Sequence, residues 1–178
     1  MKLSNIQKTV LVLAVTAAIT RIAPHYPNFT AMGALAFMGG QLMRKAVPTL
    51  AVAAVVLFGT DFILNNFVYG IGADFTWFYA GSIYTFLGLA AYGIIGLFPK
   101  SFVGRLGGIT IGAVAFFLLS NFGAWISSPM LYPATSEGLV QCYIAGLPYF
   151  LPEFGATLIF SEATVAAAKY FNTTAAQA

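Results

Sequence analysis

The chain has 178 residues, of which 60% are hydrophobic and only 7% are charged. A soluble domain carries roughly 25% charged residues, so this composition excludes a soluble domain and indicates an integral membrane protein. The single cysteine and single histidine exclude an intramolecular disulfide, a CxxC metal site and a bis-histidine haem. The net charge of +3 comes from basic residues scattered at the ends of apolar segments, which argues against nucleic-acid binding.

The apolar segments predict an all-α membrane protein, in which one domain over residues 1–178 forms a bundle of six transmembrane helices. The first segment continues past signal-peptide length and ends at Arg21 without a small-residue cleavage site, so we interpret it as an uncleaved helix. The expected spans are residues 7–22, 29–43, 47–65, 77–98, 105–126 and 154–171.

The basic residues predict the orientation. If the N-terminus is cytoplasmic, seven of the eight lysines and arginines lie inside and only Arg21 lies outside. We therefore expect a multi-pass protein of the bacterial inner (cytoplasmic) membrane with both termini in the cytoplasm. Its outer loops are the longer and more aromatic ones, which favours a site that opens outward.

The segment from Arg21 to Thr30 contains the only histidine, His25, and two prolines. The span that follows is short, because 15 residues cover about 22 Å of a hydrocarbon core about 30 Å thick. We expect this loop to dip into the bundle, with Asn28 or Thr30 capping the next helix. Arg21, His25 and Asn28 are thus candidate ligand-binding residues, although a lone histidine is more often structural.

Two acidic residues interrupt apolar spans. Asp61 has Asn65 one turn later on the same helix face, which indicates either a wet strip toward the outer opening or a helix end that reaches headgroups. Glu162 lies near the middle of the sixth span, where a carboxylate facing lipid is costly. It is either a ligand or proton site or a hydrogen-bonded structural residue.

The outer ends of the last two spans hold the remaining candidates. Asn121 and Trp125 are four residues apart, a spacing that suits a ring-containing ligand but also an interhelical amide beside an interfacial tryptophan. The loop of residues 127–153 is expected to contain a short interfacial helix that starts at Ser136 and stops before Pro148. This helix carries Gln141 and Tyr143 and is either a lid over the site or an anchor.

Small residues recur every four positions in two segments. Ala14 and Ala18 lie on the first span, and Gly104, Gly108 and Gly112 lie on the fifth. Such patterns let helices approach closely, within the bundle or against another membrane subunit.

Three segments together carry a resemblance. They are Arg21–Thr30, Gly39-Gly40, and Ser120–Trp125 with Met130–Pro133 and Gly138–Pro148. They resemble an uncharacterised family of small bacterial six-helix membrane proteins, which looks similar in architecture to the substrate-binding S components of energy-coupling-factor transporters. That resemblance implies an outward cavity for a vitamin-like or metal-containing molecule. It also implies that Ala14 and Ala18 dock a transmembrane coupling subunit that works with ATPases.

The chain shows no Ser/His/Asp set, phosphate loop or paired carboxylates, so we expect neither an enzyme nor a cofactor or metal site. The favoured function is binding and uptake of a small molecule by a protein embedded in membrane lipid. The alternative is a structural or accessory subunit of a larger membrane complex.

Overall fold

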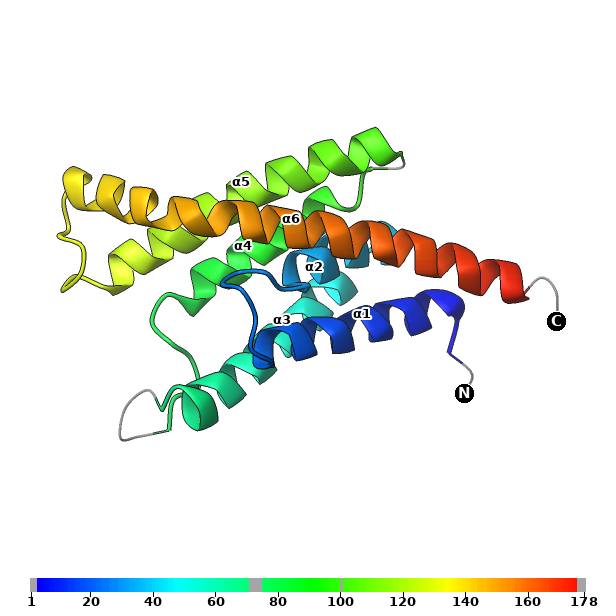
Figure 1. Cartoon of the computed structure of the whole chain (residues 1–178), viewed down its shortest axis with the longest axis horizontal. Coiled ribbons are helices and arrows are strands. Elements are labelled where there is room, and N and C mark those ends of the chain that lie inside the picture. The colour runs from blue at the N-terminus through cyan, green and yellow to red at the C-terminus, as the bar shows by residue number, and fades with distance from the viewer. Residues whose placement is uncertain (1–2, 71–74, 100, 176–178) are drawn as a thin grey trace.

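The structure is a computed structural model that describes residues 3–70, 75–99 and 101–175. Its elements are α1 (Asn5–Ile22), α2 (Met32–Met43), α3 (Ala46–Ile63), the π-helical segment η1 (Leu64–Val68), α4 (Ser82–Ile95), α5 (Phe102–Ser127) and α6 (Ser136–Ala175). The described residues form no β-strand, so the predicted all-α fold is confirmed. Figure 1 shows that α1 begins and α6 ends at the same end of the bundle.

Four helical segments are long and apolar enough to cross a membrane: Asn5–Ile22, Ala46–Val68, Phe102–Ser127 and Ser136–Tyr170. This is consistent with the expected membrane protein. The other two helices, α2 and α4, have only 12 and 14 residues. At 1.5 Å per residue they measure about 18 and 21 Å, less than the hydrocarbon core of about 30 Å. The six-span topology therefore stays a prediction.

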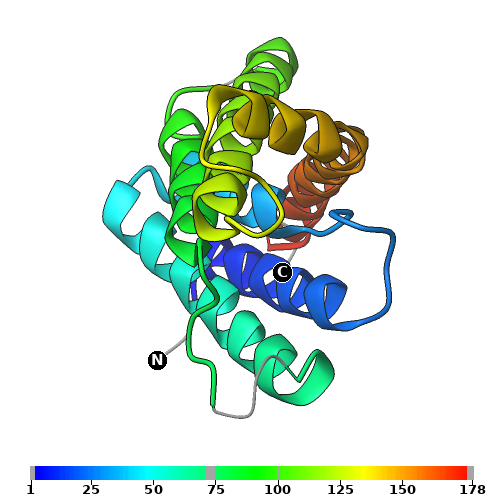
Figure 2. The same cartoon turned by 90° about the vertical axis from the view of Figure 1, so that its left-hand side faces the viewer.

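The short helix α2 lies at the centre of the bundle and contacts all the other α-helices (Figure 2). Every residue from Met32 to Gly40 is buried, as expected for a helix that is hydrophobic all round. Glycines let its neighbour α4 approach closely. A Cβ at Gly40 would lie 2.2 Å from the carbonyl oxygen of Gly93, and a Cβ at Gly96 would lie 2.1 Å from that of Phe37.

The helix α6 corrects the expected end of the chain. It begins at Ser136, where the interfacial helix was expected to start, but it does not stop before Pro148. It runs for 40 residues through both Pro148 and Pro152, so the separate interfacial helix is wrong. A proline inside a helix removes one hydrogen bond and bends the helix rather than always ending it. Figure 2 shows this bend, with the first turns of α6 lying across the end of the bundle.

Two other helices begin later than expected. The segment before α2 turns at Asn28, which has a positive φ of 60°, so α2 starts at Met32 and not at residue 29. The segment before α4 turns at Gly81, which has a φ of 89°, so α4 starts at Ser82 and not at residue 77. At Gly81 a Cβ would lie 3.0 Å from the carbonyl oxygen of Gly123, so this turn packs tightly on α5.

Candidate ligand-binding site

A cavity of about 440 Å³ lies beside the C-terminal ends of α1 and α3 and is lined by residues of every α-helix. Its volume is in the range of roughly 300–1,000 Å³ that is typical of small-molecule sites. The lining residues are Arg21, His25, Asn28, Thr30, Met32, Gly33, Asp61, Leu64, Asn65, Tyr69, Tyr79, Thr85, Leu89, Phe116, Ser120 and Glu153. Four of the residues that the sequence singled out, Arg21, His25, Asn28 and Asp61, thus come together on one cavity.

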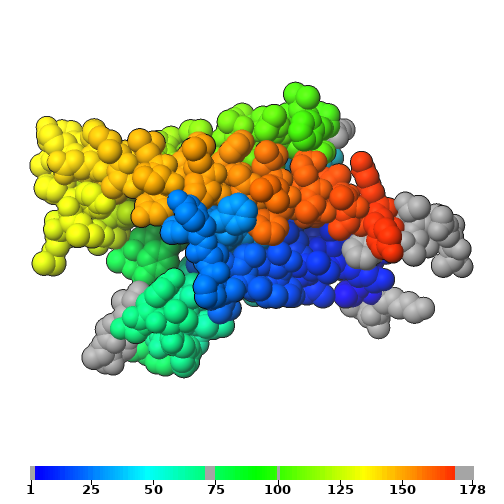
Figure 3. All heavy atoms as spheres, in the orientation of Figure 1, coloured from blue at the N-terminus to red at the C-terminus, as the bar shows by residue number. Residues whose placement is uncertain are grey.

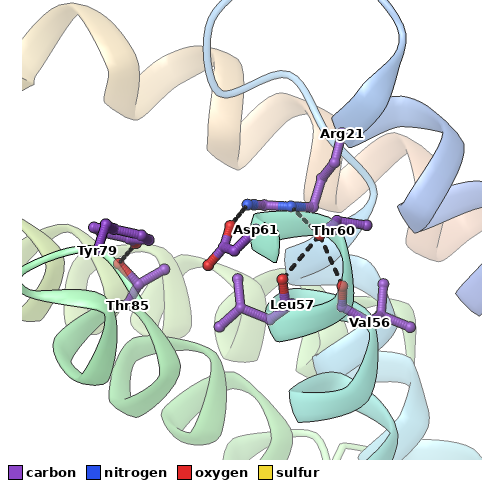
Figure 4. Close-up of polar contacts among 7 residues, drawn as sticks. All are labelled: Arg21, Val56, Leu57, Thr60, Asp61, Tyr79 and Thr85. Carbon is purple, nitrogen blue, oxygen red and sulfur yellow. Dashed lines mark hydrogen bonds and ion pairs between the residues drawn. The ribbon is translucent and has the colours of Figure 1, made fainter. Parts of the chain in front are cut away.

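The last turn of α1 is tied to α3 by Arg21 (Figure 4). Its Nη2 donates to Oδ1 of Asp61 in a short ion pair, and its Nε donates to Oγ1 of Thr60 at 2.8 Å. The Thr60 hydroxyl in turn donates to the carbonyl oxygens of Val56 at 2.7 Å and Leu57 at 2.9 Å. Since Thr60 takes Nε, the guanidinium reaches Asp61 through one nitrogen only.

Asp61 and Asn65 each keep an unpaired polar atom. The Asp61 side chain is only 4% exposed, and its Oδ2 accepts no hydrogen bond from any described residue. Asn65 is 4% exposed, and its Nδ2 likewise donates to no described residue. Asn65 lies in the π-helical segment η1, whose wider turn changes its angle relative to Asp61 on the preceding α-helix. The two side chains do not pair with each other.

Glu153 contributes a second buried carboxylate, which the sequence-based interpretation had placed at the end of an outer loop. The structure places it inside α6 at 9% exposure, on the cavity wall. The Tyr92 hydroxyl donates to both of its carboxylate oxygens at 3.0 Å, and the Thr157 hydroxyl donates to Oε1 at 3.0 Å. Gly33 of α2 packs against this cluster, because a Cβ there would lie 2.1 Å from Oγ1 of Thr157.

The loop between α1 and α2 forms the rim of the cavity. Residues 22–28 are exposed, and only the following residues descend to Ala31, which is fully buried. Figure 3 shows this loop at the surface beside α6, where the ring of Phe29 lies 6.1 Å from that of Phe160. Residues 24–28 therefore do not dip into the bundle as expected.

Neither expected capping residue caps α2. The N-cap is Ala31, and no side chain caps the helix end. The backbone N–H of Ala31 instead donates to the Thr20 hydroxyl of α1 at 3.0 Å. His25 lies on the rim, and its Nδ1 is 2.7 Å from the carbonyl oxygen of Ala23. In the described part of the chain, no three His, Cys, Asp or Glu side chains gather as metal ligands.

Four sequence candidates belong to the α5–α6 hairpin and do not line the 440 Å³ cavity. Asn121 lines an adjoining space of about 100 Å³, and its Nδ2 donates to the Phe117 carbonyl at 2.8 Å. Trp125 donates from Nε1 to the Pro133 carbonyl at 2.9 Å, and the Tyr143 hydroxyl donates to the Leu118 carbonyl at 3.0 Å. Gln141 is exposed on α6 and lines neither space.

Glu162 also lies outside the cavity. It accepts two hydrogen bonds from Arg105 of α5, from Nε at 2.8 Å and from Nη2 at 2.7 Å. Both carboxylate oxygens are therefore paired, and this ion pair joins α5 to α6. The sequence carried no sign of this pairing, because Arg105 was assigned to the membrane boundary and Glu162 to mid-span.

The small-residue patterns pack largely within the chain. A Cβ at Gly108 would lie 2.9 Å from the Phe37 ring, and a Cβ at Gly112 would lie 2.2 Å from the Tyr92 ring. Gly104 lies in the first turn of α5, where its backbone N–H donates to the Ser101 hydroxyl at 3.1 Å. On α1, Ala14 packs against the hydrophobic core and Ala18 is half-buried.

In the described residues, these features define an all-helical protein with four helical segments that are long and apolar enough to cross a membrane, and with a sizeable cavity lined by polar and apolar residues. The chain belongs to the family described as "Family of unknown function (DUF6580)", whose model matches residues 2–178. The comparisons found no matching curated protein and no matching solved structure. None of them links the chain to the S components that it was expected to resemble.

Proposed function

We propose that this protein binds a vitamin-sized small molecule in the 440 Å³ cavity and takes part in its uptake across the bacterial inner membrane. The observation that carries the proposal is the cavity itself, which combines buried polar groups with apolar walls. Arg21, Asp61 and Glu153 supply charge, whereas Leu89 and Phe116 supply apolar surface. Small-molecule sites typically combine apolar walls with polar groups in fixed positions.

The distribution of basic residues supports an outward opening. Arg44 donates to the Leu97 carbonyl just after α4, close to the start of α5 at Phe102, and Arg105 lies in the first turn of α5. This is the end of the bundle at which α1 begins and α6 ends (Figure 1). Under the positive-inside rule that end is cytoplasmic, so the cavity beside Arg21 opens to the outside.

In this proposal all six helices lie in the membrane, and both termini are cytoplasmic. The short helices α2 and α4 then reach only part of the bilayer depth, which leaves room above α2 for a ligand. Uptake would need an energy source outside this chain, as in S components, where a coupling subunit and ATPases supply it.

Thermal unfolding of the full-length protein in detergent, measured across a panel of vitamins and metal complexes, tests the proposal. We expect at least one compound to raise the midpoint by several degrees, because a ligand that binds only the folded state stabilises it. No shift with any compound, together with no small molecule retained on purification, would contradict a binding function. Fixed-stoichiometry co-purification with other subunits would then favour the accessory-subunit alternative.

A further inference from the structure

Two arginine–carboxylate pairs in this chain differ in one respect that bears on ligand chemistry. In the Arg105–Glu162 pair, both carboxylate oxygens accept a hydrogen bond from the guanidinium. In the Arg21–Asp61 pair, only Oδ1 is bonded, and Oδ2 is buried without a partner among the described residues. The first pair is saturated and lies away from the cavity, whereas the second lines the cavity and keeps an acceptor unused.

An unused donor lies one turn further along, on Asn65, which also lines the cavity. The Nδ2 of Asn65 is buried and donates no hydrogen bond within the described residues. The adjacent Asn66 shows that side-chain amides in η1 can find hydrogen-bond partners. Its Nδ2 donates to the carbonyls of Phe62 and Thr76, and its Oδ1 accepts from the Thr76 N–H. Buried polar atoms are almost always paired, so an acceptor and a donor left open on one cavity call for a ligand.

We propose that the cavity recognises an uncharged group that presents an N–H donor beside an acceptor, such as a primary carboxamide or the matching edge of an amino-substituted nitrogen heterocycle. The ligand N–H donates to Oδ2 of Asp61, and the ligand acceptor receives a hydrogen bond from Nδ2 of Asn65. This inference rests on the proposed function, because it names the ligand class of the same cavity.

The charges around the site argue against other ligand classes. An anion would face Oδ2 of Asp61 without a proton to give it. A cation that presents only donors would leave Nδ2 of Asn65 unpaired. Glu153 keeps its negative charge, because its hydrogen bonds come from the neutral hydroxyls of Tyr92 and Thr157. A cation held by Glu153 would still leave Nδ2 of Asn65 without an acceptor.

Four probes that share a phenyl ring test this recognition. They are benzamide, which has both a donor and an acceptor, acetophenone, which has only the acceptor, the cation benzamidine and the anion benzoate. Binding to the full-length protein in micelles is measured by ligand-observed NMR at about millimolar concentrations, a range that fragments of this size reach. We expect benzamide to bind at least tenfold more tightly than the other three probes.

Variants separate recognition from stability. Asp61→Asn and Asn65→Leu should each remove the preference for benzamide, whereas Glu162→Gln, which opens the saturated pair, should keep it. Asn65→Leu leaves the Arg21–Asp61 pair intact, so it still tests the recognition if Asp61→Asn fails to fold. For any one probe, partition into micelles cancels between variants, because all variants share the same detergent. A sample of micelles without protein corrects the comparison between probes.

Equal affinity for the four probes, no binding of benzamide, or a preference that survives both cavity variants would overturn the inference. Those results differ from failure of the proposed function, which would appear as no thermal shift with any vitamin or metal complex. A compound that stabilises the protein but lacks the donor–acceptor edge would uphold the function and reject this ligand class.

Discussion

Arg21 contacts Asp61 through one guanidinium nitrogen only, because its Nε donates to Thr60 at 2.8 Å. The contact fixes the end of α1 against α3. It leaves one buried oxygen of Asp61, a residue that lines the cavity, without a partner in the described part of the chain. The Thr60 hydroxyl thus makes the Arg21–Asp61 pair different from the Arg105–Glu162 pair. Arg105 bonds both oxygens of Glu162, whereas Arg21 leaves one oxygen of Asp61 available to a ligand.

Loss of either partner of this pair should destabilise the fold. Removing one member of a buried pair leaves the other charge uncompensated, at a cost of about 3 kcal/mol. We expect Arg21→Met and Asp61→Asn each to lower the free energy of unfolding by that amount, as measured by denaturant titration in mixed micelles. The double variant should lose less than the sum of the two single losses. Strictly additive losses would show that the two side chains do not interact.

Thr60→Val tests whether the Thr60 hydroxyl, by accepting from Nε of Arg21, keeps Oδ2 of Asp61 free of a hydrogen bond to Arg21. Without the hydroxyl, Nε of Arg21 is free to bond Oδ2 of Asp61, as Nε of Arg105 bonds Glu162. We expect a loss of only about 1 kcal/mol of stability, because one hydrogen bond is exchanged for another. The benzamide preference should disappear, since its acceptor becomes occupied. Thr60→Ser, which keeps the hydroxyl, should behave like the natural chain, and an unchanged preference in Thr60→Val would contradict this account.

Gly33→Ala should disturb the contact between α2 and α6. Its Cβ would lie 2.1 Å from Oγ1 of Thr157 and 2.8 Å from Oε1 of Glu153, so one helix must move. Overpacking of this kind costs about 1–3 kcal/mol, measurable by thermal unfolding. The matched control is Gly155→Ala on α6, where nothing lies within 4 Å of the new Cβ. That variant should be neutral or slightly more stable, because alanine favours helix. Equal effects at both sites would refute the close contact.

The orientation predicts which ends of the bundle a membrane-impermeant maleimide reaches in intact cells whose outer membrane has been permeabilised. The background is Cys142→Ser, because Cys142 is the only natural cysteine and is buried. A cysteine at the exposed Tyr26 on the cavity rim should be labelled, whereas a cysteine at the exposed Lys45 should be labelled only after lysis. The reverse pattern would mean that the cavity opens to the cytoplasm.

The sequence predicted the all-helical class and some of the residues that line the cavity. Arg21 and Asp61 stood out because charged residues are rare in so apolar a chain, and their shared cavity follows from both lying at the ends of their helices. The bond of Thr60 to Arg21 was not predictable, because it depends on the register between two helices that a sequence does not reveal.

Glu153 was missed because Pro148 and Pro152 indicated the end of one helix and the start of another. A signal was present in the spacing, since Glu153, Thr157 and Ser161 recur every four residues and are all buried on α6. Such a polar strip on an apolar helix indicates a face turned into the bundle. The spacing of Asn121 and Trp125 suited a ligand, but neither residue lines the 440 Å³ cavity, and their hydrogen bonds go to the backbone of their own hairpin. A ligand contact by these two residues stays a prediction.

Native mass spectrometry of a cavity-blocking variant tests the central claim most directly. Ser120 of α5 is half-buried on the cavity wall, and Thr110, ten residues earlier on the same helix, is exposed. We predict that the natural chain and Thr110→Phe retain the same bound small molecule after gentle purification, and that folded Ser120→Phe does not. Retention of that molecule by Ser120→Phe, or its absence from all three proteins, would contradict a ligand-binding function for this cavity.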